Sequence, residues 1–394
     1  MSFRWMFLIF LTIALLIMGS VHGYIYSRLV LAAALPDPWS TVIGVALIVV
    51  VLCIPFSFVV SRVLDKCAAR LFVVPMYVWL GFVTLLFFLV LGVDATRGFL
   101  CIGSRITGLT CPFGDPANRL LLWRVTAGAG TGLVLLATIF SIWWGLTRLV
   151  VKRLDVTLPK LPPELDGFTM VQLSDLHLDL VHGREWLAGV VERANALNPD
   201  LMVITGDLAE GSVAQFSHEV EPLRELSAPH GVFFVTGNHE YFHDLNGWLQ
   251  HLDELGVRVL RNERVSIGRD GASFDLAGID DHEGGRIEPG HGPELERAME
   301  GRDPERASVL LAHQPRAVSA ASKHDVGLVL SGHTHGGQIW PFSYMVYLQQ
   351  PYVRGLKVHN GTQLYISAGT GFWGPPMRLG TTAEITLITL RAPE

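Results

Sequence analysis

Glutamate and cysteine are missing from opposite parts of this 394-residue sequence. The first glutamate is Glu164, whereas all four cysteines precede residue 112. Residues 1–150 contain ten Lys or Arg against four Asp, a net charge of +6, so the remaining residues must carry −12 to reach the total of −6. Only His22 lies in the first part, and the other fourteen histidines follow residue 170. We therefore expect two domains of different character, joined near residue 150.

The lack of cysteine after Cys111 limits the kinds of metal site that the second part can form. No thiolate is available there, so a metal would be bound by His, Asp, Glu and Asn. Imidazole and oxygen ligands suit Mn, Fe, Mg or Zn at a hydrolytic site, and a cysteine zinc knuckle is excluded.

Charge is scarce, at 17% of residues against about 25% in ordinary soluble domains. Four stretches of the first part contain no charged residue and are long enough to cross a bilayer, which takes roughly 20 apolar residues. They are Trp5–Tyr26, Ser40–Ser61, Leu71–Val93 and Val125–Thr147. We predict an all-α membrane domain of four transmembrane helices over residues 1–150. A cleaved signal peptide is the alternative for the first stretch, because Arg4 precedes its apolar core.

Basic residues near the spans predict the orientation of the chain. Four spans place both chain ends on one side of a membrane, and seven Lys or Arg fall on that side against five on the other. This bias favours a multi-pass protein of the inner (plasma) membrane with its second domain in the cytoplasm. Cys101 and Cys111 would then face outward, where a disulfide could persist. A disulfide and two unpaired thiols both stay open.

The second domain begins after a proline-rich connector. Residues 157–167 contain three prolines, which indicate an extended linker over residues 151–166. From residue 167 to residue 394, runs typical of β-strands such as "LMVITGD" and "VFFVTGN" alternate with helical spacing such as "REWLAGVVERANALN". This alternation predicts an α/β domain with buried sheets.

Nearly every predicted strand ends in a polar side chain of a metal-binding type. In open α/β sheets, ligands bind at the carboxyl ends of the strands. A single such residue would be an ordinary turn residue, since Asp and Asn favour turns. Repetition of the pattern, in a domain without cysteine, indicates a metal site. The residues are Asp175, His177, Asp207, Asn238, His239, Asp280, His313, His333 and His335.

Five of these strand-end blocks occur in a characteristic order. They are D-x-H at Asp175, G-D at Asp207, G-N-H-E at Asn238, a single His313, and G-H-x-H at His333. The ordered set resembles the calcineurin-like metallophosphoesterase superfamily over about residues 166–390. "GHTHGGQIWPF" and "SAGTGFWGPPMRLG" resemble its bacterial membrane-anchored, phosphodiesterase-type branch. The protein serine/threonine phosphatases fit less well, because they carry Asp-Arg-Gly soon after the G-D block, whereas "GDLAEGS" stands here.

The resemblance implies a two-sheet αββα sandwich and a role for each block. One metal would be held by Asp175, His177 and His335, and a second by Asn238, His313 and His333. Asp207 would bridge the two metals. His239 would be the catalytic residue, acting as general acid or stabilising the phosphate. The cofactors would be two divalent ions, Mn, Fe or Zn, with Mg or Ni as alternatives.

The implied activity is hydrolysis of phosphoric esters by a membrane-anchored enzyme. A phosphodiesterase or pyrophosphatase that uses a metal-bridging hydroxide is the favoured reaction. A phosphomonoesterase or protein phosphatase is one alternative, and a metal-binding membrane sensor or scaffold without turnover is another. The expected partners are a phosphoester or pyrophosphate substrate, with a lipid-linked one as a narrower version, and the lipid bilayer. Nothing in the sequence indicates nucleic-acid binding.

Two further residues are candidates for contact with the substrate. Arg378 could bind a phosphate through its two parallel N–H groups, and a surface arginine is the alternative. Trp340 begins "WPFSYMVYLQQPYV", an aromatic and nearly uncharged segment that also includes Val353. The segment is either packed as a loop in the core, or forms a hydrophobic rim for a lipid-like substrate or the bilayer, where Trp and Tyr are favoured.

Overall fold

A computed structural model describes residues 3–394 of the chain, and Met1 and Ser2 of the predicted membrane domain lie outside the described residues. The side chains of Arg4 and Arg62, which enter the predicted orientation, also lie outside the description. The chain forms two compact units. The helical unit extends to Trp143 and includes Pro375–Met377, and the α/β unit comprises Trp144–Gly374 and Arg378–Glu394.

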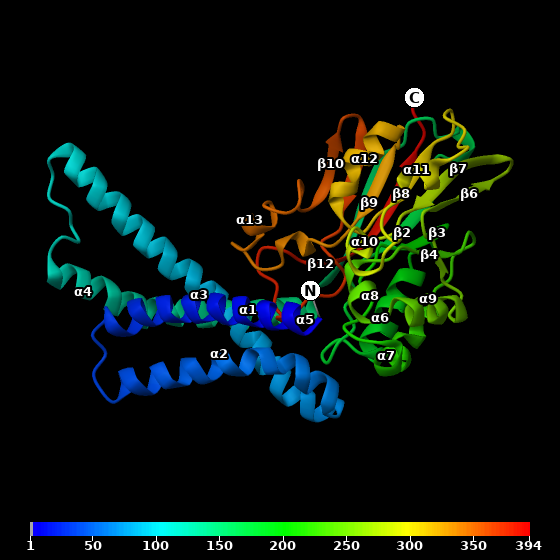
Figure 1. Ribbon diagram of the computed structural model, residues 1–394. Helices are drawn as coiled ribbons and strands as arrows, with labels where there is room; N and C mark the ends of the chain where they lie inside the picture. Colours follow the sequence, from blue (N-terminus) through cyan, green and yellow to red (C-terminus); the bar gives the residue numbers. More distant parts are fainter. Residues whose placement is uncertain (1–2) are drawn as a thin grey trace. The chain divides into compact units, whose positions relative to one another are not determined.

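The helical unit is built from long apolar helices (Figure 1). Within the described residues, four stretches are long and apolar enough to cross a membrane, namely Leu11–Leu31, Trp39–Ser57, Lys66–Thr107 and Pro116–Thr147. Large apolar side chains such as Leu16, Ile48 and Leu136 point outward and are exposed, as expected where lipid surrounds the helices. The predicted four-helix membrane domain is confirmed. Its helices are α1 (Phe3–Tyr26), α2 (Trp39–Val63), α3 (Lys66–Thr107), α4 (Pro116–Val125) and α5 (Thr131–Thr147), with π-helical turns at Ser27–Leu31 and Thr126–Gly130.

Helix α3 is much longer than a membrane requires. Its 42 residues span about 63 Å at 1.5 Å per residue, twice the roughly 30 Å of a hydrocarbon core. Asp65 caps its start by accepting hydrogen bonds from the Cys67 and Ala68 amides, and Gly108 ends it in the left-handed conformation. A disulfide joins Cys101, within the last turns of α3, to Cys111, which follows the helix end, and this settles the pairing that the sequence left open.

The α/β unit contains two six-stranded mixed sheets. The first has the strand order β1-β12-β2-β3-β4-β5 and the second β10-β11-β9-β8-β7-β6. The strands of the first sheet are β1 (Leu149–Thr157), β2 (Thr169–Leu173), β3 (Leu201–Ile204), β4 (Val232–Phe234), β5 (Arg258–Val259) and β12 (Ala383–Arg391). Those of the second are β6 (Glu263–Arg269), β7 (Ala272–Gly278), β8 (Ser308–Leu311), β9 (Leu328–Ser331), β10 (Gly355–His359) and β11 (Thr362–Ile366).

Strand β1 occupies part of the segment that the sequence assigned to a linker. It pairs in parallel with β12 from Leu149↔Ala383 to Thr157↔Arg391, so the predicted boundary at residue 150 falls inside a strand. The β-branched Val150, Val151 and Val156 favour this conformation, and the prolines begin only at Pro159. The connector is therefore shorter than the 151–166 range that its prolines suggested.

Three apolar layers make the α/β unit a four-layer sandwich. One core fills the space between the first sheet and the helices, with Val171 and Ile204 against Leu187 and Trp248. A second lies between the sheets, and a third packs the outer face of the second sheet against short helices. The helices are α6 (Arg184–Asn195), α7 (Val213–Val220), α8 (Asn238–His243), α9 (Leu245–Glu254), α10 (Gly284–Ile287), α11 (Leu295–Met299), α12 (Val318–Ala321) and α13 (Ser343–Val346).

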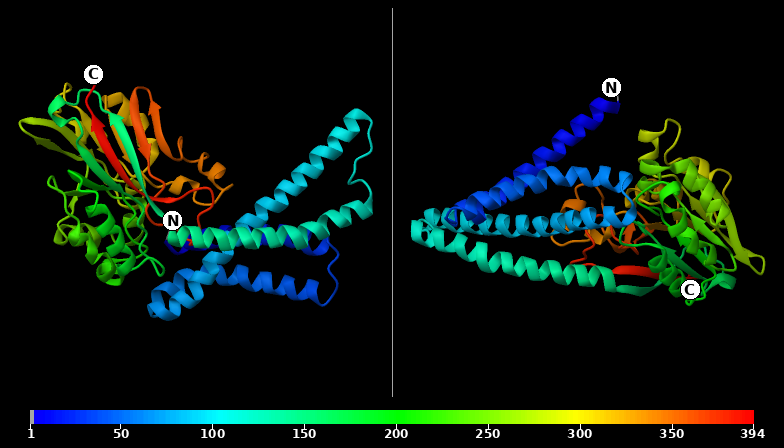
Figure 2. Two further views of the ribbon diagram at one scale, coloured as in Figure 1. Left: turned by 180° about the vertical axis from the view of Figure 1, so that it is seen from behind. Right: turned by 90° about the horizontal axis from the view of Figure 1, so that it is seen from below.

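Both faces of the central strands are covered by apolar packing. β2, β3, β8 and β9 are almost uniformly buried and consist mainly of apolar residues, as buried parallel strands do. The left view of Figure 2 shows the green helices on the opposite side of the strands from the yellow and orange elements. The predicted αββα sandwich is confirmed. Because β2, β3 and β4 are parallel neighbours, and so are β8 and β9, their carboxyl ends can form one site.

Candidate metal centre

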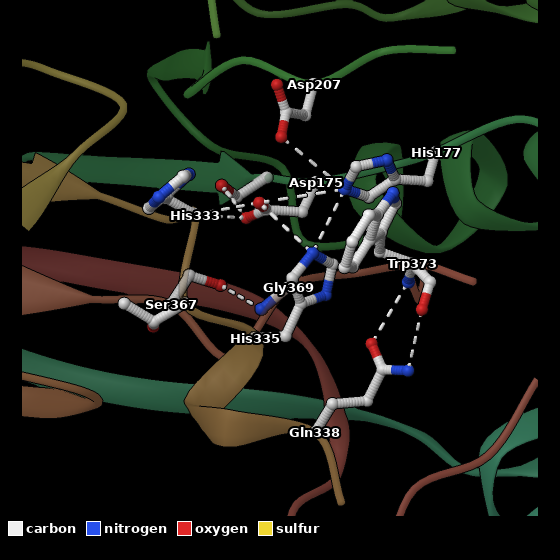
Figure 3. A network of polar contacts seen from close by, with 12 residues as sticks. Asp175, His177, Asp207, His333, His335, Gln338, Ser367, Gly369 and Trp373 are labelled. Carbon is white, nitrogen blue, oxygen red and sulfur yellow. Dashed lines mark hydrogen bonds and ion pairs between the residues drawn. The ribbon is translucent and has the colours of Figure 1, made fainter. Parts of the chain in front are cut away.

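The five sequence blocks meet at the carboxyl ends of five strands. The block at Asp175 follows β2, Asp207 follows β3, and Asn238 follows β4 at the start of α8. His313 follows β8, and His333 follows β9. Figure 3 shows part of this cluster, with side chains from both sheets pointing toward one another. The structure thus brings together the residues that the sequence proposed as metal ligands: Asp175, His177, Asp207, Asn238, His313, His333 and His335.

The backbone of these blocks is strained. Asp175, His177, Asp207, His333 and His335 have positive φ values between 43° and 69°, a region that residues other than glycine seldom adopt. Such conformations cost on the order of 1–3 kcal/mol each and gather at functional sites. Their concentration at the proposed ligands indicates that the surrounding fold holds these side chains in place despite the cost in backbone energy.

One group of ligand atoms forms around Asp175, His177 and His335, which are all buried. The Nε2 atoms of His177 and His335 are 3.0 Å apart, and His335 Nε2 is 3.5 Å from Asp175 Oδ1. One ligand atom from each residue lies within 4.8 Å of the other two. This group corresponds to the first predicted metal position.

A second group forms around His313, His333 and Asn238. Asn238 Oδ1 is 3.1 Å from both His313 Nε2 and His333 Nδ1, and these two nitrogens are also 3.1 Å apart. Asp207 Oδ2 lies between the two groups, 3.1 Å from His313 Nε2 and 3.5 Å from His177 Nε2. From this position the Asp207 carboxylate can reach the ligand atoms of both groups.

The donor set fits two cations. His313 donates from Nδ1 to the Thr205 carbonyl at 2.7 Å, and His177 Nδ1 is 2.5 Å from Glu210 Oε1, so the Nε2 atom of each ring presents a lone pair to the cluster. These lone pairs face those of Asp207 and Asn238 and would repel them without a positive charge between. Hydrogen bonds from the outer ring nitrogen commonly fix metal-binding histidines in this way. The arrangement therefore suits divalent ions with nitrogen and oxygen ligands.

Burial and neighbouring charges set the protonation of the cluster. Burial lowers the pKa of His333 to about 3 and, with the neighbouring His177, lowers the pKa of His335 well below its usual range. For His313, burial also lowers the pKa, but the carboxylates of Asp207 and Asp175 outweigh it and raise the pKa well above 6.5. A bound cation would add its own charge and drive protons off its ligands.

His239 lies beside the cluster and is paired with a carboxylate that sequence reasoning missed. Glu210 Oε1 is 2.8 Å from His239 Nδ1 and 2.5 Å from His177 Nδ1. Burial lowers the pKa of His239, but the Glu210 and Asp207 carboxylates raise it further and bring it to about 9. His239 Nε2 is 4.0 Å from Asp207 Oδ2. The ring is thus held in a charged, oriented form at the edge of the cluster.

Glu240 is a second carboxylate whose role the sequence did not reveal. It accepts hydrogen bonds from the backbone amides of Gly237 at 2.6 Å, Leu208 at 2.7 Å and Asp207 at 3.1 Å. This links the start of α8 to the loop after β3 and so fixes Asn238 relative to Asp207. The three-residue spacing from Gly237 is that of a helix capping box, which is a signal visible in the sequence.

Glycine allows the backbones to approach closely at this site. A Cβ at Gly206, where φ is 86°, would lie 2.6 Å from the Gly237 nitrogen and 2.7 Å from His313 Nδ1. A Cβ at Gly332 would overlap Ser174 and Asp175 side-chain oxygens. These glycines of the G-D and G-H-x-H blocks are therefore required by packing.

Arg378 lies behind the cluster, where it is fully buried. Its guanidinium donates hydrogen bonds to the backbone carbonyls of Ala368 at 2.8 Å, of Gly369 at 3.2 Å and of Gly371. It also donates to the His335 carbonyl and to the Thr381 hydroxyl. It is not the surface arginine considered as an alternative. Burial lowers its pKa to about 10, which leaves it charged at neutral pH.

Trp340 lies outside the cluster and is 55% exposed. Trp373, which comes closer, is also exposed, and its ring centroid is 6.2 Å from that of His239. Figure 3 shows Trp373 beside His177. The Gln338 side chain forms hydrogen bonds with the backbone nitrogen and oxygen of Trp373.

Comparison with known proteins adds to this geometry. The family model for calcineurin-like phosphoesterases matches residues 168–337. An uncharacterised metallophosphoesterase of Campylobacter jejuni is 32% identical over 98% of this chain and 99% of its own length. This chain belongs to the calcineurin-like phosphoesterase family.

Other relatives match large parts of the chain. The "transmembrane protein with metallophosphoesterase domain" of Bos taurus is 38% identical over 75% of this chain and 70% of its own length. An uncharacterised metallophosphoesterase of Helicobacter pylori is 37% identical over 62% of this chain and 65% of its own length. The chain is a membrane-type metallophosphoesterase, a metal-dependent hydrolase of phosphoesters with bacterial relatives.

Proposed function

We propose that this metallophosphoesterase hydrolyses phosphodiester or pyrophosphate bonds with two divalent cations. One cation would be held by Asp175, His177 and His335. The other would be held by Asn238, His313 and His333, with Asp207 bridging the two. The convergence of Asp175, His177 and His335, and that of Asp207, His313 and His333 with Asn238 Oδ1, support this assignment. The ligand chemistry suits Mn, Fe or Zn, with Mg or Ni as alternatives. When bound, such ions supply Lewis-acid activation of the phosphoryl oxygens and of water.

The residues of the chain orient the substrate and handle the proton. His239 is placed to be the general acid, since Glu210 holds its Nδ1 and leaves Nε2 directed to the cluster. A protonated Nε2 can donate to the oxygen of the leaving group as the P–O bond breaks. Asp207 also accepts the His239 backbone N–H at 3.0 Å, which couples the position of the acid to that of the bridging carboxylate.

The hydrogen bonds of Arg378 to backbone carbonyls are the observation that favours a diester substrate over a monoester. A phosphomonoester carries a second negative charge, which a free arginine would bind bidentately. Arg378 instead donates to backbone carbonyls around His335 and Gly369, and we assign it to holding that loop in place. Two exposed aromatic residues, Phe242 and Trp373, flank His239 with ring centroids 5.5 and 6.2 Å away. This surface suits a second organic substituent on the phosphate.

A substrate comparison tests the proposal. Full-length protein loaded with Mn²⁺ should hydrolyse bis(p-nitrophenyl) phosphate with a higher kcat/KM than p-nitrophenyl phosphate. Asn238→Ala should release one of the two ions and abolish turnover, because it removes the oxygen shared by His313 and His333. Asn246→Ala, on the exposed face of α9, is the matched control and should behave as wild type.

The outcomes separate the alternatives. Faster hydrolysis of the monoester would replace the diester assignment with a phosphomonoesterase or protein phosphatase. Two bound ions without hydrolysis of either compound would favour the sensor or scaffold. The metal count is measured by elemental analysis of the purified chain.

We also propose an inner-membrane location with the α/β unit in the cytoplasm. The basic residues Lys66 and Arg70 at the start of α3, and Arg148 and Lys152 after α5, support this side. A reporter fused after Glu394 tests it. Activity of a cytoplasm-dependent reporter is expected, and activity of a periplasmic one would reverse the orientation.

A further inference from the structure

A run of exposed apolar side chains lies on the α/β unit between Trp340 and Leu348. We call this run the aromatic surface. α13, inside it, has no buried residue among its four described positions. Single exposed apolar residues are normal, but a contiguous group usually marks an interaction site. The aromatic surface consists of Trp340, Phe342, Tyr344, Met345, Tyr347 and Leu348, which are 46–77% exposed.

The aromatic surface is joined to the edge of the metal centre. Gln338, two residues before Trp340, donates to the Trp373 carbonyl at 2.9 Å and accepts from its amide at 3.0 Å. Trp373 in turn neighbours His239, the proposed acid. Gln338 therefore links the segment that leads into the aromatic surface to an exposed aromatic residue beside the proposed acid.

Within the α/β unit, the last residues of α5 contact the segment that follows the hydrogen-bond partner of Trp340. Trp144, in the last turns of α5, donates from its indole to the Thr382 hydroxyl at 3.2 Å, and both residues belong to the α/β unit. The neighbouring Leu379 carbonyl accepts from the Trp340 amide at 2.8 Å. Only Arg148 separates α5 from β1. One residue spans at most about 3.6 Å, so the connection between α5 and β1 is short.

Charge along this part of the chain suits a bilayer surface. The α/β part of the sequence is acidic overall, yet no Asp or Glu occurs between Asp325 and Glu384. Arg354 and Lys357, which follow the aromatic surface, are exposed. Anionic lipids attract Lys and Arg and repel carboxylates, and Trp and Tyr favour the level of the headgroups.

We propose that the aromatic surface rests in the interface of the lipid bilayer, and that the metal centre acts on the phosphoester of an amphiphile held in that bilayer. This deepens the proposed function and rests on it for the reaction. Water adds to phosphorus, the P–O bond to the leaving group breaks, and the acyl or alkyl part of the substrate stays in the membrane. Contact of the aromatic surface with lipid removes its apolar side chains from water, and this transfer favours binding of the surface to the membrane.

The position of the surface is tested without any enzymatic activity. Leu348→Cys is made in full-length protein that also carries Cys53→Ser and Cys67→Ser, which removes both free cysteines that the structure describes. The new thiol is labelled with an NBD fluorophore, without reductant so that the Cys101–Cys111 bond stays closed, and the protein is placed in vesicles of phosphatidylethanolamine and phosphatidylglycerol. Asp253→Cys on α9, on the other side of the α/β unit from α13, is the control (Figure 1).

Quenching of the NBD group by nitroxide-labelled lipids decides the outcome. We expect at least about twofold quenching at position 348 and none at position 253. Equal quenching at both positions, or none at position 348, would overturn the docking of this surface. A second copy of this chain on the surface would give the latter result, because it would shield the probe from lipid.

The substrate class is tested with two compounds that both release p-nitrophenol, which is soluble and can be measured by its absorbance. Hexadecyl p-nitrophenyl phosphate in mixed vesicles represents the amphiphile, and bis(p-nitrophenyl) phosphate represents a water-soluble diester. Tyr344→Ser combined with Leu348→Ser should lower kcat/KM for the amphiphile by about tenfold or more, because burial of one large apolar side chain already exceeds that factor. The soluble diester should be hydrolysed at the wild-type rate, and Gln349→Ser should change neither reaction.

The results distinguish this inference from the function on which it rests. An equal loss for both probes, or no loss for either, would overturn the amphiphile as substrate. If wild-type protein hydrolysed neither probe with any divalent metal, the proposed function would fail, and the lipid quenching would still decide whether the aromatic surface meets the bilayer.

Discussion

Replacement of Glu210 by glutamine should weaken the metal centre and its acid together. One oxygen of Glu210 contacts the outer nitrogens of both His177 and His239, at 2.5 and 2.8 Å. Glu210→Gln keeps the size and an oxygen acceptor but removes the charge. Loss of such a partner of a ligating histidine typically costs about 10–100-fold in metal affinity or activity. We expect a loss in this range for the ion held by His177, and little change for the ion held by His313.

The pH dependence of Glu210→Gln should change in a defined direction. His239 acts as an acid only while it is protonated, so the rate should fall as pH rises through its pKa. The Glu210 carboxylate is one of the charges that raise this pKa to about 9. Without that charge the pKa falls, and the alkaline limb of kcat should move to lower pH by roughly one to two units, the usual effect of a single close charge.

Both effects can be measured on one preparation. Isothermal titration calorimetry with Mn²⁺ gives the affinities of the two ion sites. Hydrolysis of bis(p-nitrophenyl) phosphate from pH 6 to pH 10 gives the position of the alkaline limb of kcat. Glu192→Gln, on the exposed face of α6, is the matched control for loss of a carboxylate. Unchanged affinities together with an unmoved alkaline limb in Glu210→Gln would refute the role assigned to this carboxylate.

Three further substitutions probe the same centre. His239→Ala should retain both ions and lose rate by roughly 10²–10⁴, the usual contribution of a positioned acid, and loss of an ion on elemental analysis would contradict that role. Gly332→Ala should lower the ion count and activity, because its Cβ would displace the Asp175 carboxylate, whereas Gly361→Ala, in an open turn, should not alter the ion count. Glu240→Gln should lower thermal stability through about 1–3 kcal/mol of unsatisfied backbone amides, and an unchanged melting temperature would contradict this.

Local sequence patterns were sufficient to predict that the strand-end residues lie together at one edge of the sheets. A short apolar run followed by a turn fixes where a strand ends, and the parallel arrangement of β2, β3 and β4 then brings the following residues to one edge. Asp175, Asp207 and Asn238 are examples in which strand order and block order agree. The four apolar helices were equally predictable, because a bilayer imposes length and composition directly on the sequence.

Contacts between distant segments were not predictable in the same way. Glu210 stands in a polar loop, where an acidic residue is ordinary, and only the fold brings it against His177 and His239. Arg378 could have been a surface or a phosphate-binding residue, and the loop that folds around its guanidinium decided its burial. Residues 151–157 were read as a linker because of the prolines that follow, but pairing with β12 made them a strand.

The sequence by itself determined a charge-poor helical part, a cysteine-free α/β part and the identity of the seven proposed ligands. These properties depend on composition and on the spacing of nearby residues, which are the same in the unfolded and the folded chain. Only the tertiary structure decided how closely the ligand atoms converge, which carboxylate holds the proposed acid, and that the apolar side chains of Trp340–Leu348 stay exposed. Those facts depend on distances between segments far apart in the chain, which packing alone sets.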